Sequence, residues 1–306
     1  MTTASTTATP ATAVTHVLIT GATAGIGRTT ALDLARRGYH VIATGRRVAE
    51  LDKLRAEAPV GSRLDTAVLD VTSAESIAKA AVEVDRLTGG HGLDVLVNNA
   101  GFGVMGPMSE ISDSELRRQY DTNVFGLMAV TRAFLPAMRD RGRGRIINVS
   151  SMGGKMTFPF MGAYNSTKYA IESMSDALRY ELRPFGVDVV LIEPGVIRTN
   201  FADTSMSSVS QYEGTIYGPA VARADKLRAR MESTAVGPEV IARAIHKAIR
   251  RRRPAARYVA PWFGHLVFGL LAVTPTRVQD FAFRRLGYLT SATLQKRVML
   301  ADGARA

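Results

Sequence analysis

Short apolar runs rich in valine, isoleucine and leucine alternate with longer amphipathic segments along most of the chain. The runs have the length and the β-branched content of buried strands, and the segments between them have the apolar spacing of helices. We expect strands at His16–Thr20, Val41–Thr44, Leu64–Leu69, Leu93–Val97, Ile146–Val149 and Val187–Ile192, with a last candidate at Tyr258–Ala260. We expect helices at Ile26–Arg37, Val48–Ala58, Ser73–Leu87, Ala163–Arg183 and Pro238–Arg250, and a long one over about 114–139 kinked near Pro136. This alternation predicts an α/β fold, a doubly wound parallel sheet of Rossmann type.

The regions outside this pattern divide the chain into three parts. Residues 1–13 are rich in threonine and alanine, without the cationic start or long apolar run of a secretory signal, and we expect a disordered tail. Residues 14–260 form the predicted single domain, in which 201–237 is poor in regular pattern. Residues 261–306 form a C-terminal extension that is apolar and basic.

Composition and charge narrow the classes of site that the chain can carry. The sequence has no cysteine, which excludes disulfides, thiolate metal sites and a cysteine nucleophile, and which fits a reducing cytoplasm. Its five histidines are scattered without ligand spacing, so we expect no metal site. The net charge of +12 includes basic clusters at 139–145, 223–230 and 250–257. These could meet a phosphate, an acidic carrier or an anionic membrane, whereas no pattern of nucleic-acid recognition accompanies them.

A glycine-rich segment, Thr20–Gly27, joins the first expected strand to the first expected helix. Glycine lets the backbone turn tightly and approach a pyrophosphate, and the helix N-terminus behind it favours negative charge. The spacing is G-x-x-x-G-x-G rather than the usual G-x-G-x-x-G. Its place between a strand and a helix nevertheless favours nucleotide binding over a plain tight turn.

The end of the second expected strand indicates which dinucleotide is preferred. An NAD site needs a carboxylate there to bind the ribose hydroxyls, but this chain has Arg46 and Arg47 instead. A guanidinium can bind a 2′-phosphate through two hydrogen bonds. We therefore predict NADP(H), with Arg46 as the first phosphate ligand and Arg47 as the second.

Tyr164 and Lys168 are four positions apart in an expected helix, so their side chains share one face. Free tyrosine titrates near pH ~10, too high for acid–base work at neutral pH, and a neighbouring cation lowers that pKa. The pair is a candidate proton donor, although the same spacing is common in solvated helix turns.

Further motifs follow one another in a fixed order, namely Asn98-Asn99-Ala100-Gly101, Asn123, Ser151 and Pro194-Gly195. With the glycine-rich loop and the Tyr164–Lys168 pair, they make the sequence resemble the short-chain dehydrogenase/reductase family over roughly Val14 to Ala260. The C-terminal extension and many apolar side chains near the expected site are similar to steroid- and retinol-type members.

The resemblance implies a role for each catalytic residue. Tyr164 would be the general acid/base that gives a proton to a carbonyl oxygen, and Lys168 would lower its pKa and hold the nicotinamide ribose. Ser151, thirteen residues before Tyr164, would polarise and position the carbonyl. Asn123 would support a proton-relay water near Lys168.

The resemblance also implies an NADP(H) site assembled from short segments. Its pyrophosphate and 2′-phosphate contacts would be Gly21, Thr23, Gly25, Ile26, Gly27, Arg46 and Arg47. Its adenosine side would be Asp70, Val71, Asn98, Ala100 and Gly101, and its nicotinamide side Pro194, Gly195, Val196 and Thr199, together with Tyr164 and Lys168. Many NADPH-using relatives have a basic residue where this chain has Ala24, so more of the cofactor selection depends on Arg46.

The function implied is that of an NADP-dependent oxidoreductase, reducing a carbonyl or oxidising a secondary alcohol. Residues 201–237 would cover the substrate, and their apolar side chains indicate a lipophilic one, such as a steroid, a retinoid or a fatty-acyl-like compound. Two alternatives stay open: a ketoacyl-type reductase acting on a carrier-bound substrate, and a catalytically silent NADP-sensing or scaffold protein. Family members are usually dimers or tetramers, so we expect a homodimer or a homotetramer.

The apolar run at 261–273 follows the basic run at 250–253. It is shorter than the ~20 apolar residues of a spanning helix. Residues 258–273 could lie in a membrane surface anchored by the arginines, roof the substrate site or enter a subunit interface. We favour a lid or buried role in a cytoplasmic protein, with peripheral membrane contact as the open alternative.

Overall fold

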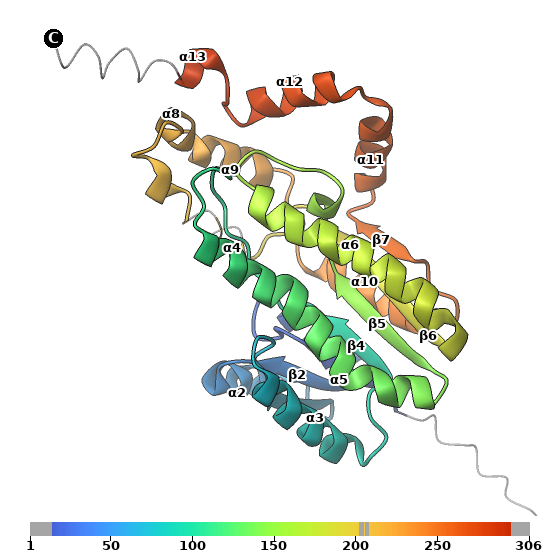
Figure 1. Cartoon of the computed structure of the whole chain (residues 1–306). Helices are drawn as coiled ribbons and strands as arrows, with labels where there is room; N and C mark the ends of the chain where they lie inside the picture. Colours follow the sequence, from blue (N-terminus) through green and yellow to red (C-terminus); the bar gives the residue numbers. More distant parts are fainter. Residues whose placement is uncertain (1–13, 202–204, 206–207, 295–306) are drawn as a thin grey trace, which may run out of the picture.

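One parallel sheet of seven strands forms the centre of the molecule, in the order β3-β2-β1-β4-β5-β6-β7 (Figure 1). The computed structural model describes residues 14–201, 205 and 208–294, so the predicted tail 1–13 lies outside the described residues. The strands are β1 His16–Ile19, β2 His40–Gly45, β3 Arg63–Val68, β4 Val95–Asn98, β5 Gly144–Val149, β6 Val187–Pro194 and β7 Arg257–Ala260. The predicted doubly wound sheet is confirmed, including its last candidate strand.

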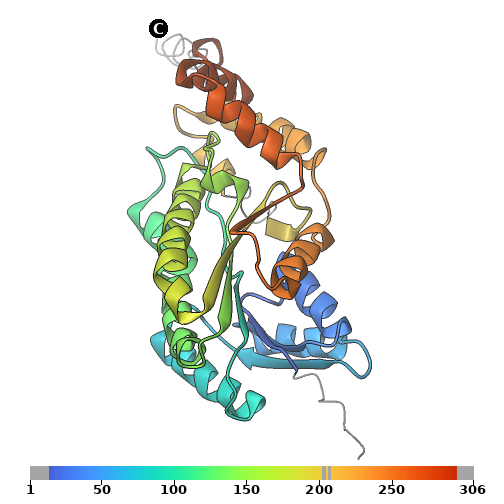
Figure 2. The same ribbon diagram turned by 90° about the vertical axis from the view of Figure 1, so that its right-hand side faces the viewer.

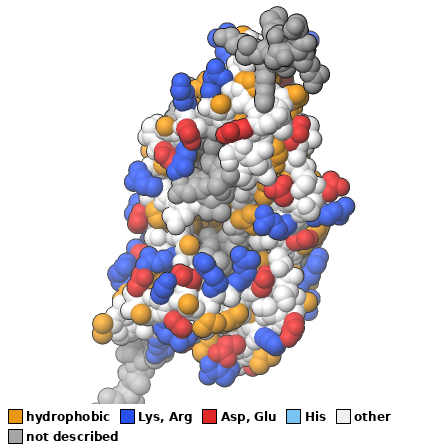
Figure 3. Space-filling view, turned by 90° about the vertical axis from the view of Figure 1, so that its left-hand side faces the viewer, with side chains coloured by type: hydrophobic (Ala, Val, Ile, Leu, Met, Phe, Trp, Pro, Cys, Tyr) orange, Lys and Arg blue, Asp and Glu red, His pale blue; other side chains and the backbone are white. Residues whose placement is uncertain are grey.

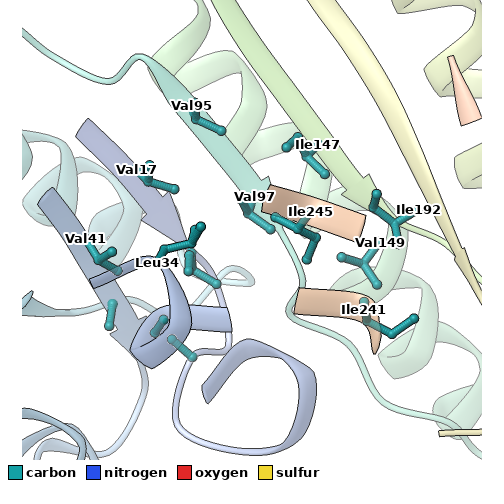
Figure 4. Close-up of a cluster of buried hydrophobic side chains, with 14 of the residues drawn as sticks. Val17, Leu34, Val41, Val95, Val97, Ile147, Val149, Ile192, Ile241 and Ile245 are labelled. Carbon is teal, nitrogen blue, oxygen red and sulfur yellow. The ribbon is translucent and has the colours of Figure 1, made fainter. Parts of the chain in front are cut away.

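Helices cover both faces of the sheet (Figure 2). The main ones are α1 Gly25–Arg36, α2 Val48–Ala56, α3 Ala74–Thr88, α5 Leu127–Asp140, α6 Gly162–Leu182 and α10 Glu239–Arg250. Because successive strand side chains point to opposite faces, Val17 packs with α1 and α10, whereas Leu18 packs with α3, α5 and α6. Figure 4 shows Leu34 of α1 and Ile245 of α10 meeting valines and isoleucines of the sheet.

The order of the strands creates the place for a ligand. The chain leaves β1 toward β2 and β3 on one side and then crosses to β4 on the other, so β1 is hydrogen-bonded to both β2 and β4. Ligands of open α/β sheets bind at such a reversal, at the carboxyl ends of the strands. Those ends carry the glycine-rich loop and the segments that follow β4, β5 and β6.

The expected long helix is interrupted in a place that the sequence did not indicate. It consists of α4 Asp113–Tyr120, a π-helical turn η1 Asp121–Gly126, and α5. We expected a kink near Pro136, but that residue lies inside α5, and the irregular turn comes ten residues earlier. π-helical turns are frequent at functional sites, and this one carries Asn123.

The segment 201–237 contains more helix than its sequence pattern predicted. Its described part includes η4 Ser210–Tyr212, α8 Gly218–Val221 and α9 Ala224–Glu232. A parallel bridge joins Ile197, which precedes the segment, to Val236 near its end.

The C-terminal extension is helical and lies at one end of the molecule (Figure 1). It comprises α11 Gly264–Val273, α12 Thr276–Leu286 and α13 Ser291–Leu294. None of the helices among the described residues has both the length and the apolar content needed to cross a bilayer. On the face in Figure 3, basic side chains are interspersed with acidic ones.

Candidate active site

Tyr164 and Lys168 lie on the first two turns of α6, and both side chains are 7% exposed. The Lys168 Nζ donates a hydrogen bond of 2.9 Å to the carbonyl oxygen of Val149, the last residue of β5. The same Nζ lies 5.7 Å from the centroid of the Tyr164 ring. Ser151, two residues beyond β5, shares a hydrogen bond with the Tyr164 hydroxyl. The structure thus brings the three predicted catalytic side chains together.

The environment of these groups determines their charge. Burial raises the pKa of Tyr164 to about 12, and the hydrogen bond with Ser151 opposes that rise. Burial lowers the pKa of Lys168 to about 8, against the attraction of the Glu172 carboxylate. We expected Lys168 to lower the tyrosine pKa, but in the protein alone burial dominates. The phenol is therefore protonated at neutral pH, which is the form that donates a proton.

Asn123 links the π-helical turn to two other parts of the site. Its Oδ1 accepts a hydrogen bond of 3.0 Å from the Phe102 backbone N–H. Its Nδ2 donates to the Phe102 carbonyl at 2.9 Å and to the Thr167 hydroxyl at 3.1 Å. A Cβ added at Gly101 would lie 3.1 Å from the Asn123 Oδ1 and 3.9 Å from the Lys168 Nζ. The asparagine therefore fixes the chain after β4 against α6, close to the lysine.

The glycine-rich loop turns back tightly between β1 and α1. Gly21 and Gly25 both have positive φ, at +63° and +51°, which only glycine adopts readily. At Gly27 an added Cβ would overlap the Gly21 carbonyl oxygen and lie 2.5 Å from the Asn99 Nδ2. The backbone of the loop can fold this closely only because these side chains are missing. It leaves the start of α1 open to an anion.

The predicted 2′-phosphate ligands follow β2. Arg46 and Arg47 are both exposed, and the loop residue Thr23 packs against Gly45. Burial raises the pKa of Asp70, but the hydrogen bonds from Thr72 and, to a smaller extent, the Arg46 charge outweigh it and hold that pKa below its usual value. Arg46 therefore lies near the end of β3, where Asp70 is placed.

The residues after β6 close the opposite side of the crevice. The Gly195 N–H donates to the Ala260 carbonyl at 2.8 Å, and the Val196 carbonyl accepts from Val236 at 3.1 Å. A Cβ added at Gly25 would lie 3.3 Å from the side chain of Thr199. The segment that begins at Pro194 therefore reaches across to the glycine-rich loop.

Known proteins resemble the chain in sequence and in fold. Residues 15–209 match the family described as short chain dehydrogenase. The chain belongs to the short-chain dehydrogenase family. An uncharacterized oxidoreductase, YbbO, of Escherichia coli (strain K12) is 39% identical over 264 residues, which cover 86% of this chain and 92% of the relative.

Two relatives of this short-chain dehydrogenase have names that include a substrate. The NADPH-dependent 3-dehydrocapnine reductase of Ornithobacterium rhinotracheale is 33% identical, with 88% of this chain and 95% of the relative covered. The 3-ketodihydrosphingosine reductase of Bacteroides thetaiotaomicron is 35% identical, with coverages of 88% and 96%.

Two solved structures share the fold. A short-chain dehydrogenase from Streptomyces avermitilis superposes with a TM-score of 0.71 and 32% identity, covering 90% of this chain and 98% of that one. The closed form of serine dehydrogenase complexed with NADP+ superposes with a TM-score of 0.69 and 30% identity, covering 80% of this chain and 93% of that one. The expected fold, family and oxidoreductase class are confirmed.

One predicted cofactor contact of this short-chain dehydrogenase has its side chain engaged inside the protein. Asn98 is buried, and its Nδ2 donates to the Thr131 hydroxyl at 3.0 Å and to the Asn148 Oδ1 at 2.9 Å. Its side chain therefore joins β4 to β5 and α5 instead of facing the crevice. The next residue, Asn99, donates to the carbonyl oxygens of Thr20 and Gly21 at 2.9 and 3.0 Å. Both lie in one motif, but only the structure distinguishes the two amides.

A cluster of buried charges that the sequence reasoning missed lies behind Lys168. Glu172 is one helical turn further along α6, and Glu193 of β6 is 0% exposed. The Arg257 Nε lies 3.3 Å from the Glu172 Oε2 and 3.1 Å from the Glu193 Oε1, and the Lys155 Nζ lies 3.2 Å from the latter. Burial, together with the Glu193 charge, raises the pKa of Glu172 to about 7. The i, i+4 spacing from Lys168 was the one signal in the sequence for this cluster.

Proposed function

We propose that the protein is an NADP(H)-dependent reductase that interconverts a carbonyl and a secondary alcohol on a lipophilic substrate. The main support is the convergence of Ser151, Tyr164 and Lys168 at the carboxyl ends of the strands, beside the glycine-rich loop. When bound, NADPH supplies the hydride. Tyr164 donates the proton to the carbonyl oxygen, and Ser151 donates a second hydrogen bond as negative charge develops there.

The two remaining catalytic residues act through Tyr164 and the cofactor. The Lys168 Nζ lies 5.7 Å from the centroid of the Tyr164 ring and would hydrogen-bond the nicotinamide ribose when the cofactor is bound. Asn123 positions the segment after β4 and supports the water through which the proton is replaced. Loss of a proton from Lys168, whose pKa is about 8, would remove the positive charge that stabilises the phenolate and so favours proton donation by Tyr164.

The residues present fit a dinucleotide phosphate. The pyrophosphate would lie on Gly21, Thr23, Gly25, Ile26 and Gly27, in a loop that folds this tightly because a Cβ at Gly21 or Gly27 would overlap neighbouring backbone atoms. Arg46 and Arg47 would hold the 2′-phosphate, with Asp70, Val71, Ala100 and Gly101 around the adenosine and Pro194, Gly195, Val196 and Thr199 around the nicotinamide. The NADPH-dependent relative and the NADP+ complex of serine dehydrogenase support the same choice.

The lipophilic substrate is inferred from the side chains next to Tyr164. The Phe201 ring lies 5.3 Å from the Tyr164 ring, centroid to centroid. Beside it, Met105, Val209 and Tyr212 form a buried apolar cluster with Met161 and Tyr217 at its margin. The name of one relative, 3-ketodihydrosphingosine reductase, supports the reduction of a keto group. We propose a ketone on a long apolar chain as the substrate class.

Neither alternative has comparable support. A silent NADP-sensing protein would not need all of Ser151, Tyr164 and Lys168, and the relatives with substrate names are reductases whose names mention no carrier.

We further propose a homodimer or homotetramer formed through α5 and α6, because Phe125, Tyr169 and Tyr180 expose 59%, 44% and 69% of their surfaces on or next to these helices. We place the protein in the cytoplasm.

A panel of carbonyl compounds of increasing chain length, followed by NADPH absorbance, tests the proposal. We expect kcat/KM to rise with chain length, and NADPH to be preferred over NADH. Arg46→Ala should reduce that preference at least about tenfold, since it removes a charged hydrogen bond to the 2′-phosphate. Arg36→Ala, an exposed arginine of α1, is the matched control. Equal use of both cofactors by the wild-type protein would refute the NADP assignment.

A further inference from the structure

The helix α11 exposes a continuous apolar stripe. Trp262, just before the helix, and Leu266, Leu270 and Val273 follow one another at spacings of four, four and three, which places them on one helical face. Their side chains are 72%, 65%, 66% and 78% exposed. The helix has no Lys, Arg, Asp or Glu, and no other described residue covers the stripe. A contiguous exposed patch of this kind marks an interaction surface.

The next helix, α12, also exposes an apolar side chain and adds positive charge. Phe281 is 55% exposed, and the guanidinium of Arg285 stacks over its ring at 4.8 Å. Arg277 and Arg284 are also exposed, and Asp280 is the one acidic residue of this helix. An apolar face bordered by arginines is typical of surfaces that lie in the headgroup region of a membrane.

The arginines expected to anchor this surface are in a different place. Arg250–Arg253 precede β7, whereas α11 follows the carboxyl end of that strand. The basic run thus lies at the opposite end of β7 from the apolar stripe. The exposed arginines that follow the stripe along the chain are those of α12.

The inner side of the same two helices packs against the catalytic segment. Phe283 of α12 meets Phe158 edge to face at 5.5 Å, and the Lys155 Nζ lies 5.2 Å from the centroid of the Phe268 ring. A Cβ added at Gly264 would lie 3.0 Å from the Met152 sulfur. Residues 152–160 connect Ser151 to the start of α6, so the extension lies beside the active site while its outer face is exposed.

We propose that α11 and α12 form a docking surface for an anionic lipid bilayer, with Trp262, Leu266, Leu270 and Val273 inserted and the α12 arginines at the headgroups. The net positive charge of α12, three arginines against one aspartate, favours an anionic surface over an apolar protein partner. Docking would bring the active site to the lipid surface, and a substrate of the class inferred above could enter from there. Only this last consequence rests on the proposed function.

Trp262 allows a direct test, because it is the single tryptophan of the chain. The full chain is mixed with vesicles of phosphatidylcholine and phosphatidylglycerol, or of phosphatidylcholine alone. We expect a blue shift of tryptophan emission and co-flotation with the anionic vesicles. Binding should be at least about tenfold weaker without phosphatidylglycerol or at high salt.

Three variants separate docking from folding and from catalysis. Leu266→Glu with Leu270→Glu, and separately Arg284→Glu with Arg285→Glu, should each weaken vesicle binding at least about tenfold. Val82→Glu changes a 73% exposed valine on α3 and should leave binding unchanged. Turnover of a short water-soluble carbonyl should stay at the wild-type level in all of them.

Two results would overturn the proposal. In the first, the wild-type protein turns over carbonyls but neither floats with anionic vesicles nor changes its tryptophan emission. That result would leave the proposed function intact. The other is a blue shift that grows with protein concentration without vesicles, together with a larger particle in light scattering. That result would assign the stripe to contact between copies of the chain.

Discussion

Thr20, the residue just after β1, should contribute strongly to stability through its hydroxyl. The side chain is 1% exposed, and its Oγ1 accepts hydrogen bonds of 2.9 Å from the backbone N–H groups of Asn99 and Ala100. Thr20→Val keeps the shape of the side chain but removes this acceptor. Two half-buried N–H groups then lose their partner, in the segment that faces the glycine-rich loop.

The expected cost follows from the number of donors left without a partner. A buried donor without an acceptor costs about 1–3 kcal/mol. Because Asn99 and Ala100 are only half-buried, we expect Thr20→Val to lower the free energy of unfolding by roughly 2–4 kcal/mol in total. This loss lowers Tm by roughly 5–10 °C in a protein of this size.

Thr30 provides a matched control for the same substitution. It lies on α1 and is 0% exposed, and its hydroxyl has no hydrogen-bond partner among the described residues. Replacing a buried hydroxyl that has no partner by a methyl group removes a desolvation cost, so Thr30→Val should be neutral or stabilising by up to about 1 kcal/mol.

Thermal unfolding monitored by circular dichroism compares the two variants with the wild-type protein. We expect the changes in the free energy of unfolding caused by the two substitutions to differ in sign, or in size by at least about 2 kcal/mol. If Thr20→Val unfolds at the wild-type temperature, or if both variants lose the same stability, the inferred role of the Thr20 hydroxyl is wrong.

Two further predictions concern the phosphate loop and the buried acids. Gly27→Ala should abolish NADPH binding in a fluorescence titration, because the added Cβ would lie 2.5 Å from the Asn99 Nδ2. The far-ultraviolet circular dichroism spectrum should stay native. Unchanged affinity for NADPH would contradict the proposed loop geometry. The pKa of Glu172 is raised from 4.5 to about 7. Between these pH values the native state holds a proton that the unfolded chain has released. The contribution of Glu172 to the free energy of unfolding therefore falls as the pH rises from about 4.5 to 7. Glu172→Gln should remove that fall from denaturant titrations at a series of pH values, whereas Glu181→Gln, exposed on the same helix, should keep it.

Much of the fold could be predicted because buried parallel strands leave a strong local signal. Runs such as Val187–Ile192 are apolar on both faces, and each expected strand is present within two residues of its bounds. The convergence of the candidate catalytic side chains was predictable for a similar reason. Ser151, Tyr164 and Lys168 belong to short motifs at strand ends or on one helical turn, and a parallel sheet gathers its strand ends at one edge.

The rest depends on contacts between distant parts of the chain. Glu172 and Glu193 are 21 positions apart and meet only because α6 packs against β6. The π-helical turn around Asn123 has no sequence signature comparable to a proline. An apolar run such as 261–273 has the same composition whether it is buried or exposed. The exposure of Leu266 and Leu270 could therefore not be predicted from the sequence.

The most direct test of the central claim is Tyr164→Phe, which removes one hydroxyl from a buried ring. We expect kcat for NADPH-dependent carbonyl reduction to fall at least about 100-fold, the usual scale for a lost general acid, with little change in the affinity for NADPH. Tyr169→Phe, on an exposed tyrosine of the same helix, should keep wild-type turnover. If Tyr164→Phe instead reduces the carbonyl at close to the wild-type rate, the phenol is not the proton donor and the proposed mechanism is wrong.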